Sequence, residues 1–400
     1  FSVASNGVLY RTDTVGCIPG ILDLWFQKRV EYKNEMKKYG KAGDDEKYAF
    51  YHKRQLVQKI LLNSLYGVLG LPAFRFYDVD NATAVTTTGQ TVIKSTADMA
   101  NIKYNKELNT PDLDSNIYID TDSVFFSAVP LMDKRFPNWK DEEQDTIAGY
   151  VNDIAEEMQD YLNDFYDILA KKVLNVDKDK HRLEIKKEYV AKAGLWIAKK
   201  RYAQWIISDN GVPCDKLDVK GLDVVRSSYP AAFRKFMSEV LIEILRGDTE
   251  EQLTDKVHAF KKDLVNMDVT SIAKAGAVKN LNKYKPKGKQ SAMFRFIKGT
   301  PAHVKAATAY NQLLSHFKVQ MKYEPLKGGD KIKWVYLKQN PFGLDAVAFT
   351  GYNDPKEIRD LVETYIDYDK IFERELLKKL EDFYGALGWG DVLSSTKTAE

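Results

Sequence analysis

The chain has 400 residues, of which 44% are hydrophobic and 12% aromatic, so it can bury sizeable cores in two or three globular domains. Its 60 basic and 57 acidic side chains leave a formal net charge of +3. This balance neither requires nor excludes nucleic acid, because a binding surface depends on where charges cluster. No uninterrupted apolar run is long enough to span a bilayer, and the first residues resemble no secretory signal. A chain that begins with Phe1 also suggests that polypeptide before it is missing.

The cysteine and histidine content gives no support to a disulfide framework or a zinc site. Cys17 and Cys214 lie far apart and have no partner at a ligand spacing, which favours a reducing, cytoplasmic compartment. The histidines are scattered without ligand spacing, so histidine-based catalysis has little support either: His52, His181, His258, His303 and His316.

The first 70 residues predict a β-hairpin followed by two helices. Residues 1–19 alternate apolar and polar side chains around Asn6-Gly7, as in a hairpin. Apolar residues then recur at steps of three and four from Ile21 to about Tyr39, and a glycine-rich break at 40–45 separates this helix from a second, from Glu46 to about Leu69. Together the two predict an antiparallel helical hairpin.

Each of these helices carries a polar stripe. Arg29 and Lys33 are four residues apart on the first helix, while Lys59, Asn63 and Tyr66 share one side of the second. Three cations from two facing helices could bind a triphosphate, because arginine offers a planar fork of donors and lysine a compact charge. Tyr66 follows Lys59 by about 10 Å of helix rise, which suits the span from phosphates to base, and the next residue, a glycine, leaves room for a base pair. A solvated basic face is the simpler interpretation of the arginine and lysine.

An acidic turn follows, in Tyr118-Ile119-Asp120-Thr121-Asp122-Ser123, between two short runs that favour strands. In extended chain Asp120 and Asp122 point to one face and Thr121 to the other. Mg²⁺ usually takes one or two protein carboxylates and leaves its other positions to water and substrate phosphates, so the pair suits a magnesium site. Ordinary turn chemistry is the alternative, because Asp-x-Asp turns between strands are common.

The rest of the chain is less informative. Residues 130–141 are interpreted as a loop, 142–172 as a helix whose apolar face packs on a sheet, 181–207 as strands and 231–267 as helices. Lys199-Lys200-Arg201-Tyr202 offers charge for phosphates and a ring for sugar or base contact, or is a surface patch. The basic loop with Lys285 and Lys287 suits a duplex backbone, with solubility as the alternative.

Two of these segments carry a family resemblance. Lys59-Ile60-Leu61-Leu62-Asn63-Ser64-Leu65-Tyr66-Gly67 and Tyr118-Ile119-Asp120-Thr121-Asp122-Ser123 resemble motifs B and C of family B DNA polymerases, in the expected order. The segment 199–202 resembles the family's basic palm motif that grips primer-template DNA, and 81–90 resembles the palm helix of the tailed-bacteriophage replicative branch. Residues 26–33 and 340–343 fit that branch as well.

The resemblance implies an α+β fold of the right-hand type, with an antiparallel-sheet palm, helical-hairpin fingers and a mainly helical thumb. It assigns 1–19 to the palm, 20–70 to the fingers, 71–221 to the palm and 222–400 to the thumb. The implied activity is template-directed DNA synthesis, in which two Mg²⁺ ions assist nucleotidyl transfer from a dNTP to the primer 3′ end. Primer-template DNA and dNTP are the implied partners, and binding through phosphates would be sequence-neutral.

The resemblance also implies roles for individual residues. Asp122 would bind both metal ions, Asp120 would support the site, and Glu188 falls near a third carboxylate of the family, although an exposed surface glutamate is an equal alternative. Nucleotide binding falls to the polar stripes: Arg29, Lys33, Lys59 (also catalytic), Asn63 and Tyr66. DNA binding falls to the remaining positions: Gly67, Lys199, Lys200, Arg201, Tyr202, Lys285 and Lys287.

The family's motif A, an Asp-x-x-Ser-Leu-Tyr-Pro-Ser segment with another essential aspartate, has no counterpart here, nor does its exonuclease domain. We therefore expect a missing amino-terminal segment or a second polypeptide to supply that carboxylate, and the isolated chain to be inactive. The tail, residues 393–400, lacks the apolar-aromatic terminus that binds a sliding clamp in relatives, so a clamp is a candidate partner on family grounds alone.

Two other functions compete with catalysis. A primer-template-binding remnant that performs no chemistry is favoured by the missing motif A and disfavoured by retention of Asp120 and Asp122. An RNA-synthesising enzyme is a weaker alternative, since the residue that excludes a ribose 2′ hydroxyl in the family normally lies near motif A.

Overall fold

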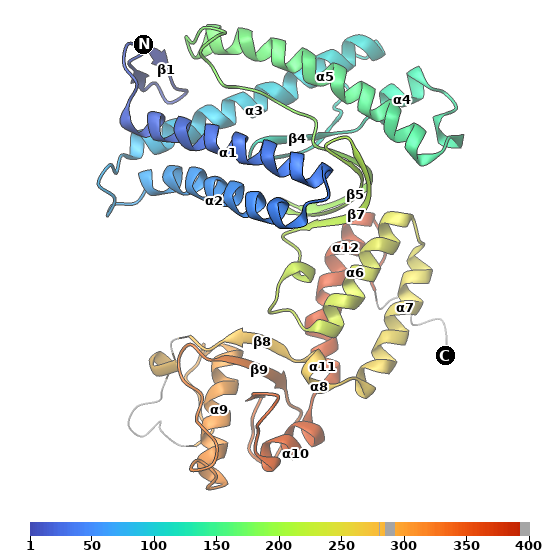
Figure 1. Ribbon diagram of the computed structural model, residues 1–400. Coiled ribbons are helices and arrows are strands. Elements are labelled where there is room, and N and C mark those ends of the chain that lie inside the picture. Colours follow the sequence, from blue (N-terminus) through green and yellow to red (C-terminus); the bar gives the residue numbers. More distant parts are fainter. Residues whose placement is uncertain (280, 285–292, 393–400) are drawn as a thin grey trace. The chain divides into compact units, whose positions relative to one another are not determined.

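The computed structural model describes residues 1–279, 281–284 and 293–392 (Figure 1). The chain divides into two compact units, residues 1–188 and 189–400, each with its own hydrophobic core. Helices alternate with small antiparallel sheets in both, which confirms the predicted α+β class. The predicted palm, 71–221, spans the boundary between the units, and the division into palm, fingers and thumb stays a prediction.

The first unit opens with a short β-hairpin and a long helical hairpin, as predicted. Strands β1 (Ser2–Val3) and β2 (Leu9–Tyr10) pair antiparallel. Helix α1 (Cys17–Lys41) then packs along α2 (Asp45–Leu69), and the turn between them contains Gly43 at a φ of +70°. Asp44 caps α2, because its side chain accepts a hydrogen bond from the Lys47 backbone N–H at 3.0 Å.

Aromatic rings rather than a buried core hold the helical hairpin together. Tyr51 of α2 stacks on Tyr39 of α1 with ring centroids 5.6 Å apart, and the Arg54 guanidinium lies 5.8 Å from the Tyr32 ring centroid. Helix α1 has no buried residue, and α2 has two. The faces of this hairpin are therefore largely solvent-accessible.

Three further helices form the core of the first unit. They are α3 (Val79–Leu108), α4 (Val129–Arg135) and α5 (Gln144–Val173), with a 3₁₀ turn, η1 (Trp139–Asp141), after α4. The expectation of a loop at 130–141 was wrong, because Pro130 occupies the first turn of α4, where its missing N–H costs nothing. The apolar face of α5 packs on α3 and α4 rather than on a sheet, around Tyr104, Met132 and Met158.

The second unit begins with an antiparallel meander of β5 (Tyr189–Ala198), β6 (Arg201–Asp209) and β7 (Val212–Lys220). The strand region expected from residue 181 therefore starts at Tyr189. A second sheet has the order β10-β9-β8, with β8 at Lys274–Ala277, β9 at Lys331–Tyr336 and β10 at Ala346–Phe349.

Helices pack against these sheets and share one core with them (Figure 1). They are α6 (Ala231–Arg246), α7 (Glu250–Asp263), α8 (Val269–Ile272), α9 (Ala302–His316), α10 (Lys356–Tyr365), α11 (Tyr368–Phe372) and α12 (Lys378–Leu387). Short turns complete the described elements: η2 (Asp223–Val225), η3 (Leu264–Asn266), η4 (Leu281–Tyr284) and the π-helical η6 (Glu373–Leu377). Among the residues that the structure describes, no helix combines the length and apolar character needed to cross a bilayer.

A buried carboxylate joins the helical end of this unit to its sheets. Glu375 of η6 is 2% exposed and pairs with Lys274 of β8 at 2.8 Å, while its backbone carbonyl accepts a 2.5 Å hydrogen bond from the Tyr229 hydroxyl. Lys379 lies 3.7 Å from Glu375 and 2.8 Å from Asp223. Two nearby lysines thus compensate the buried charge, which would otherwise be costly.

Candidate active site

The predicted acidic hairpin is present in the first unit. Strand β3 (Asn116–Asp120) pairs antiparallel with β4 (Ser123–Phe126), and Thr121 and Asp122 form the two-residue turn between them. Thr121 has a φ of +58°, unusual for a β-branched residue, and such strained positions concentrate at functional sites. Because Asp122 belongs to the turn, the strand alternation that placed both aspartates on one face applies to Asp120 alone.

The two carboxylates lie in different surroundings. Asp122 is exposed, and its carboxylate makes no hydrogen bond or ion pair with any residue that the structure describes. Asp120 is half-buried and accepts a 3.0 Å hydrogen bond from the Thr121 hydroxyl. Within 1–279, 281–284 and 293–392, no three acidic, histidine or cysteine side chains gather closely enough to hold a metal ion, so Glu188 does not join this pair.

Helix α3 fixes the position of the acidic hairpin. The Asn116 amide donates a 3.0 Å hydrogen bond to the Ala97 carbonyl, and the Ser115 backbone N–H donates one of 3.0 Å to the Asn101 side chain. The Phe126 ring contacts the buried Tyr104 ring edge to face, with centroids 5.7 Å apart. The turn is therefore carried on a rigid support rather than on a free loop.

Helix α1 presents a cluster of like charges on one stripe. Lys33 is half-buried, and burial lowers its pKa, as do the positive charges of Arg29, Lys37 and Lys186; Glu188 partly offsets them. Arg29 Nε is buried and donates no hydrogen bond within the described residues. A face that concentrates cations without enough anions to match them is chemically suited to a bound polyanion.

Two lysines that the sequence analysis did not name, Lys37 and Lys186, act on Lys33 beside Arg29. Lys59 of α2 is exposed, and its part in nucleotide binding stays a prediction. Lys37 continues the spacing of Arg29 and Lys33 by one more turn, so the sequence held a signal for it. Lys186 comes from a segment far along the chain, and sequence reasoning had no means to place it there.

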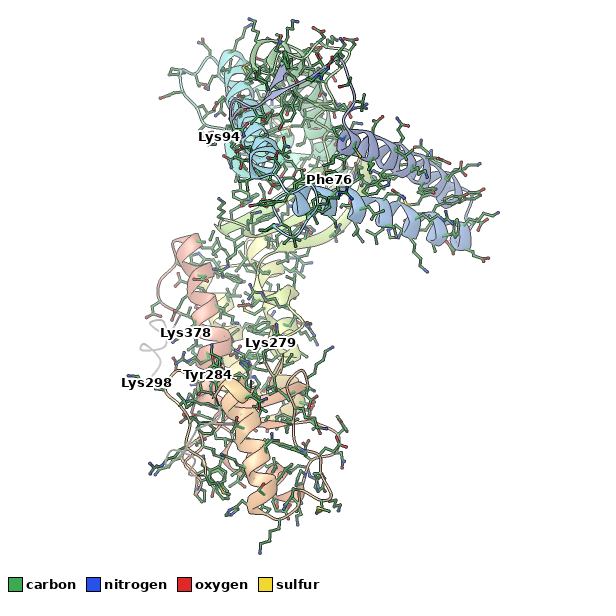
Figure 2. All side chains as sticks on the ribbon, turned by 90° about the vertical axis from the view of Figure 1, so that its left-hand side faces the viewer. Phe76, Lys94, Lys279, Tyr284, Lys298 and Lys378 are labelled. Carbon is green, nitrogen blue, oxygen red and sulfur yellow. The ribbon has the colours of Figure 1, made fainter. Side chains whose placement is uncertain are left out.

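The motif B positions on α2 are open to solvent. Asn63 is exposed and Tyr66 is 38% exposed, so both can contact a ligand without rearrangement. A Cβ added to Gly67 would meet nothing within 4 Å, so packing inside the chain does not require glycine here. The segment that leads from α2 into α3 carries a further exposed ring, Phe76, which is 50% exposed and which sequence reasoning did not single out (Figure 2).

In the second unit, the basic segment forms the turn between β5 and β6. Lys199 and Lys200 are exposed at this turn, and Lys200 has a φ of +62°. Gly221, at a φ of +66°, lies against the Lys200 carbonyl so closely that any Cβ would overlap it. The Gly221 backbone therefore supports the turn that presents both lysines.

The next two residues are more constrained than predicted. Arg201 pairs with Asp382 at 2.8 Å, so its charge is partly compensated within the chain. Tyr202 is 5% exposed and its ring stacks on Trp196, with centroids 6.3 Å apart. This burial gives the ring a packing role and does not support the expected contact with sugar or base. Lys285 and Lys287 lie outside the described residues.

Comparison with known proteins gives the family. The model of DNA polymerase family B matches residues 2–135 and 156–384. The chain is 29% identical over 82% of its length to the DNA-directed DNA polymerase of Enterobacteria phage T4, covering 36% of that protein. It is 25% identical over 96% of its length to that of Escherichia phage RB69, covering 48% of that protein, and 25% identical over 94% to a DNA polymerase of Thermococcus gorgonarius, covering 40%. The chain thus spans less than half the length of these relatives, and it belongs to DNA polymerase family B.

Proposed function

We propose that the chain carries the nucleotide-binding and part of the catalytic machinery for template-directed DNA synthesis, the transfer of a nucleotide from a dNTP to a primer 3′ end. The family membership supports DNA synthesis in general. The observation that carries the finer proposal is the exposed carboxylate of Asp122, which has no partner among the described residues and follows the strained Thr121. It lies in the same compact unit as the cation stripe of α1.

In this proposal α1 and α2 act as fingers, residues 1–19 and 71–221 as palm and 222–400 as thumb. Arg29 and Lys33 bind the triphosphate, with Lys59 and Asn63 completing the contact from α2. Mutual repulsion among the α1 cations falls when an anion binds between them, so the triphosphate would be held most tightly while its charge is greatest. Tyr66 would pack under the nascent pair, and Gly67 would leave room for it.

The carboxylate oxygens at the acidic hairpin fit magnesium, which prefers oxygen ligands and usually takes only one or two protein carboxylates. Asp122 would hold the ions and Asp120 would support the site, while Glu188, which does not gather with this pair, is left out of it. When bound, two Mg²⁺ ions would stabilise charge on the attacking and leaving oxygens. Asp122, as part of a fixed turn, would orient the primer terminus toward the triphosphate. The motif A aspartate has no counterpart in the 400 residues, so the proposal requires it from polypeptide outside them.

The absence of motif A favours a second candidate, a primer-template-binding protein without chemistry. Binding of a labelled primer-template by the chain, with Mg²⁺ and either the matched or a mismatched dNTP, separates the two. If the proposal is correct, the matched nucleotide tightens binding and Lys59→Met abolishes the gain. Lys53→Met is the control, because Lys53 is another exposed lysine of α2. DNA binding that ignores the nucleotide would favour the non-catalytic candidate.

A further inference from the structure

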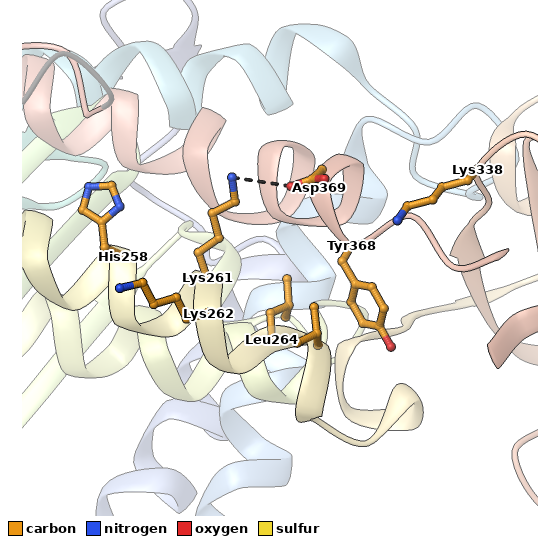
Figure 3. A pocket seen from close by; sticks show the side chains of 8 residues that line it. His258, Lys261, Lys262, Leu264, Lys338, Tyr368 and Asp369 are labelled. Carbon is orange, nitrogen blue, oxygen red and sulfur yellow. Dashed lines mark ion pairs between the residues drawn. The ribbon is translucent and has the colours of Figure 1, made fainter. Parts of the chain in front are cut away.

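A pocket of about 310 Å³ in the second unit is lined by lysines that do not converge on one ligand. Figure 3 shows the Lys262 ammonium group pointing away from Lys338 and from the Tyr368 hydroxyl. The ion pair of Lys261 with Asp369, at 3.5 Å, lies between them. The cations on α1 in the first unit are different, because a segment distant in the sequence brings a further lysine to them.

This segment, residues 181–188, belongs to no helix or strand and is called the strap below. Its odd-numbered residues are half-buried and its even-numbered residues are exposed, as in an extended chain with one covered face. The Asn163 side chain on α5 exchanges hydrogen bonds of 2.9 and 3.0 Å with the Ile185 backbone. The Lys187 backbone N–H donates one of 3.0 Å to the Gln159 side chain. Helix α5 thus fixes the strap through its backbone.

The exposed face of the strap carries alternating charges: Arg182, Glu184, Lys186 and Glu188. Arg182 pairs with Asp23 of α1 at 2.9 Å, which ties the strap to α1 near the start of that helix. Lys186 pairs with Glu184 at 2.9 Å, and both side chains are more than half exposed. The lysine is therefore held by an anion of the strap itself, at a place open to a ligand.

The strap brings Lys186 level with Lys33, a proposed triphosphate-binding residue. Between Asp23 and Lys33, α1 rises by about 15 Å. From Arg182 to Lys186, an extended chain covers about 13 Å. Burial is the main cause of the lowered pKa of Lys33, and the positive charge of Lys186 contributes to it. The tie to Asp23 and the matching lengths thus agree with the electrostatic influence, and they join Lys186 to the cations of α1.

We propose that Lys186 is a further triphosphate-binding residue and that Glu184 holds it while the site is empty. This inference rests on the proposed function, because it requires a triphosphate at the α1 cations. Lysine suits such an exchange, since its ammonium group is a compact charge on a flexible stem and can turn from one anionic oxygen to another. An exposed ion pair contributes little stability, so a phosphate can displace Glu184 at small cost.

The test is the binding of inorganic tripolyphosphate to the full chain, measured by calorimetry. Lys186→Gln removes the proposed contact. Lys180→Gln is the matched control, because Lys180 is also an exposed lysine of this region that pairs with an exposed carboxylate, that of Asp177 at 3.5 Å. Glu184→Gln removes the internal anion, and Lys33→Met tests the triphosphate site itself. Circular dichroism checks that each variant folds.

We expect Lys186→Gln to bind tripolyphosphate about fivefold more weakly than the wild type, and Lys180→Gln to bind it equally well. Glu184→Gln should bind it more tightly. Glu184→Gln combined with Lys186→Gln should bind it no better than Lys186→Gln alone, because the glutamate acts through the lysine. An equal gain from Glu184→Gln with and without Lys186 would overturn the role of Glu184.

Two results separate a failure of this inference from a failure of the proposed function. If Lys33→Met weakens tripolyphosphate binding while Lys186→Gln and Lys180→Gln both match the wild type, Lys186 is not part of the site and only this inference is overturned. If Lys33→Met also matches the wild type, the proposed triphosphate site is overturned together with it.

Discussion

Lys33, a proposed triphosphate-binding residue, shows how a charge suited to a ligand can be unfavourable to the ligand-free fold. Burial and three neighbouring cations disfavour its charged form, so its pKa is lower in the folded chain than the ordinary value of 10.5. The folded state then binds fewer protons than the unfolded state between these two pKa values. The sign of the linkage follows: the charged side chain destabilises the fold below its lowered pKa, and stability recovers as the pH rises toward 10.5.

We therefore predict that Lys33→Met raises the thermal unfolding midpoint of the ligand-free chain at neutral pH, while it weakens triphosphate binding about tenfold. The difference in unfolding midpoint between variant and wild type should shrink as the pH is raised toward 10.5. Scanning calorimetry at several pH values and a nucleotide titration measure the two effects. A variant less stable than wild type at neutral pH would contradict this account of the cluster.

At the scale of elements, Gly67 lowers the stability of helix α2, although packing within the chain does not require a glycine at this position. Glycine within a helix costs about 0.5–1 kcal/mol relative to alanine, and here a Cβ would meet open space. Gly67→Ala should thus stabilise α2 by about that amount, and it should slow nucleotide addition because the methyl group occupies the room left for a base pair. Urea denaturation and primer extension measure the two. Extension at the wild-type rate would remove Gly67 from the site.

For Gly221 we predict the opposite effect of alanine on stability. Its left-handed backbone costs any other L-residue about 1–2 kcal/mol, and the overlap with the Lys200 carbonyl adds to this cost. Gly221→Ala should therefore destabilise the chain by at least about 2 kcal/mol and displace the turn that carries Lys199 and Lys200. The free energy of unfolding, measured by denaturation, and the affinity for duplex DNA should both decline. Gly211→Ala, at another turn of the same sheet but with no atom within 4 Å of the added Cβ, should cost less.

The elements that were predicted correctly are those with a local cause. Helices α1 and α2 follow from apolar spacing and a glycine break, and the acidic hairpin from β-branched residues around a two-residue turn. Helix α4 was missed because its proline reads as a breaker until its place in the first turn is known. Buried Tyr202 was missed because β6 is buried on both faces along most of its length, which erases the alternation that separates inside from outside.

At the scale of the whole molecule, the sequence could not predict which distant segments meet. Lys186 reaches the α1 cations because Arg182 pairs with Asp23 at 2.9 Å and Ile185 exchanges hydrogen bonds with the Asn163 side chain on α5. Asp23 and Arg182 are more than a hundred positions apart, and Asn163 and Ile185 are 22 positions apart. No periodic sequence pattern predicts such contacts. The proposed roles of Asp122 and Lys59, in contrast, follow from motif resemblance.

The division into two units leads to a prediction about folding. The core of the second unit is built entirely from residues after 189, including Leu195, Phe233 and Tyr384, and needs no side chain from the first. We expect the segment 189–400, expressed alone, to fold and to unfold cooperatively. Circular dichroism and amide exchange measure this. A segment without protected amides in β6 or α9 would show that its core depends on the rest of the chain.

Primer extension tests the proposed catalysis most directly. The chain is mixed with a polypeptide carrying the motif A segment, a primer-template, dNTPs and Mg²⁺, and the wild type is compared with Asp122→Asn and with Asp112→Asn, an exposed aspartate without an ion pair in the described residues. The account predicts extension by the wild type and by Asp112→Asn. For Asp122→Asn it predicts an extension rate lower by at least about 10³-fold. Extension by Asp122→Asn at the wild-type rate, or none by the completed wild type, would contradict it.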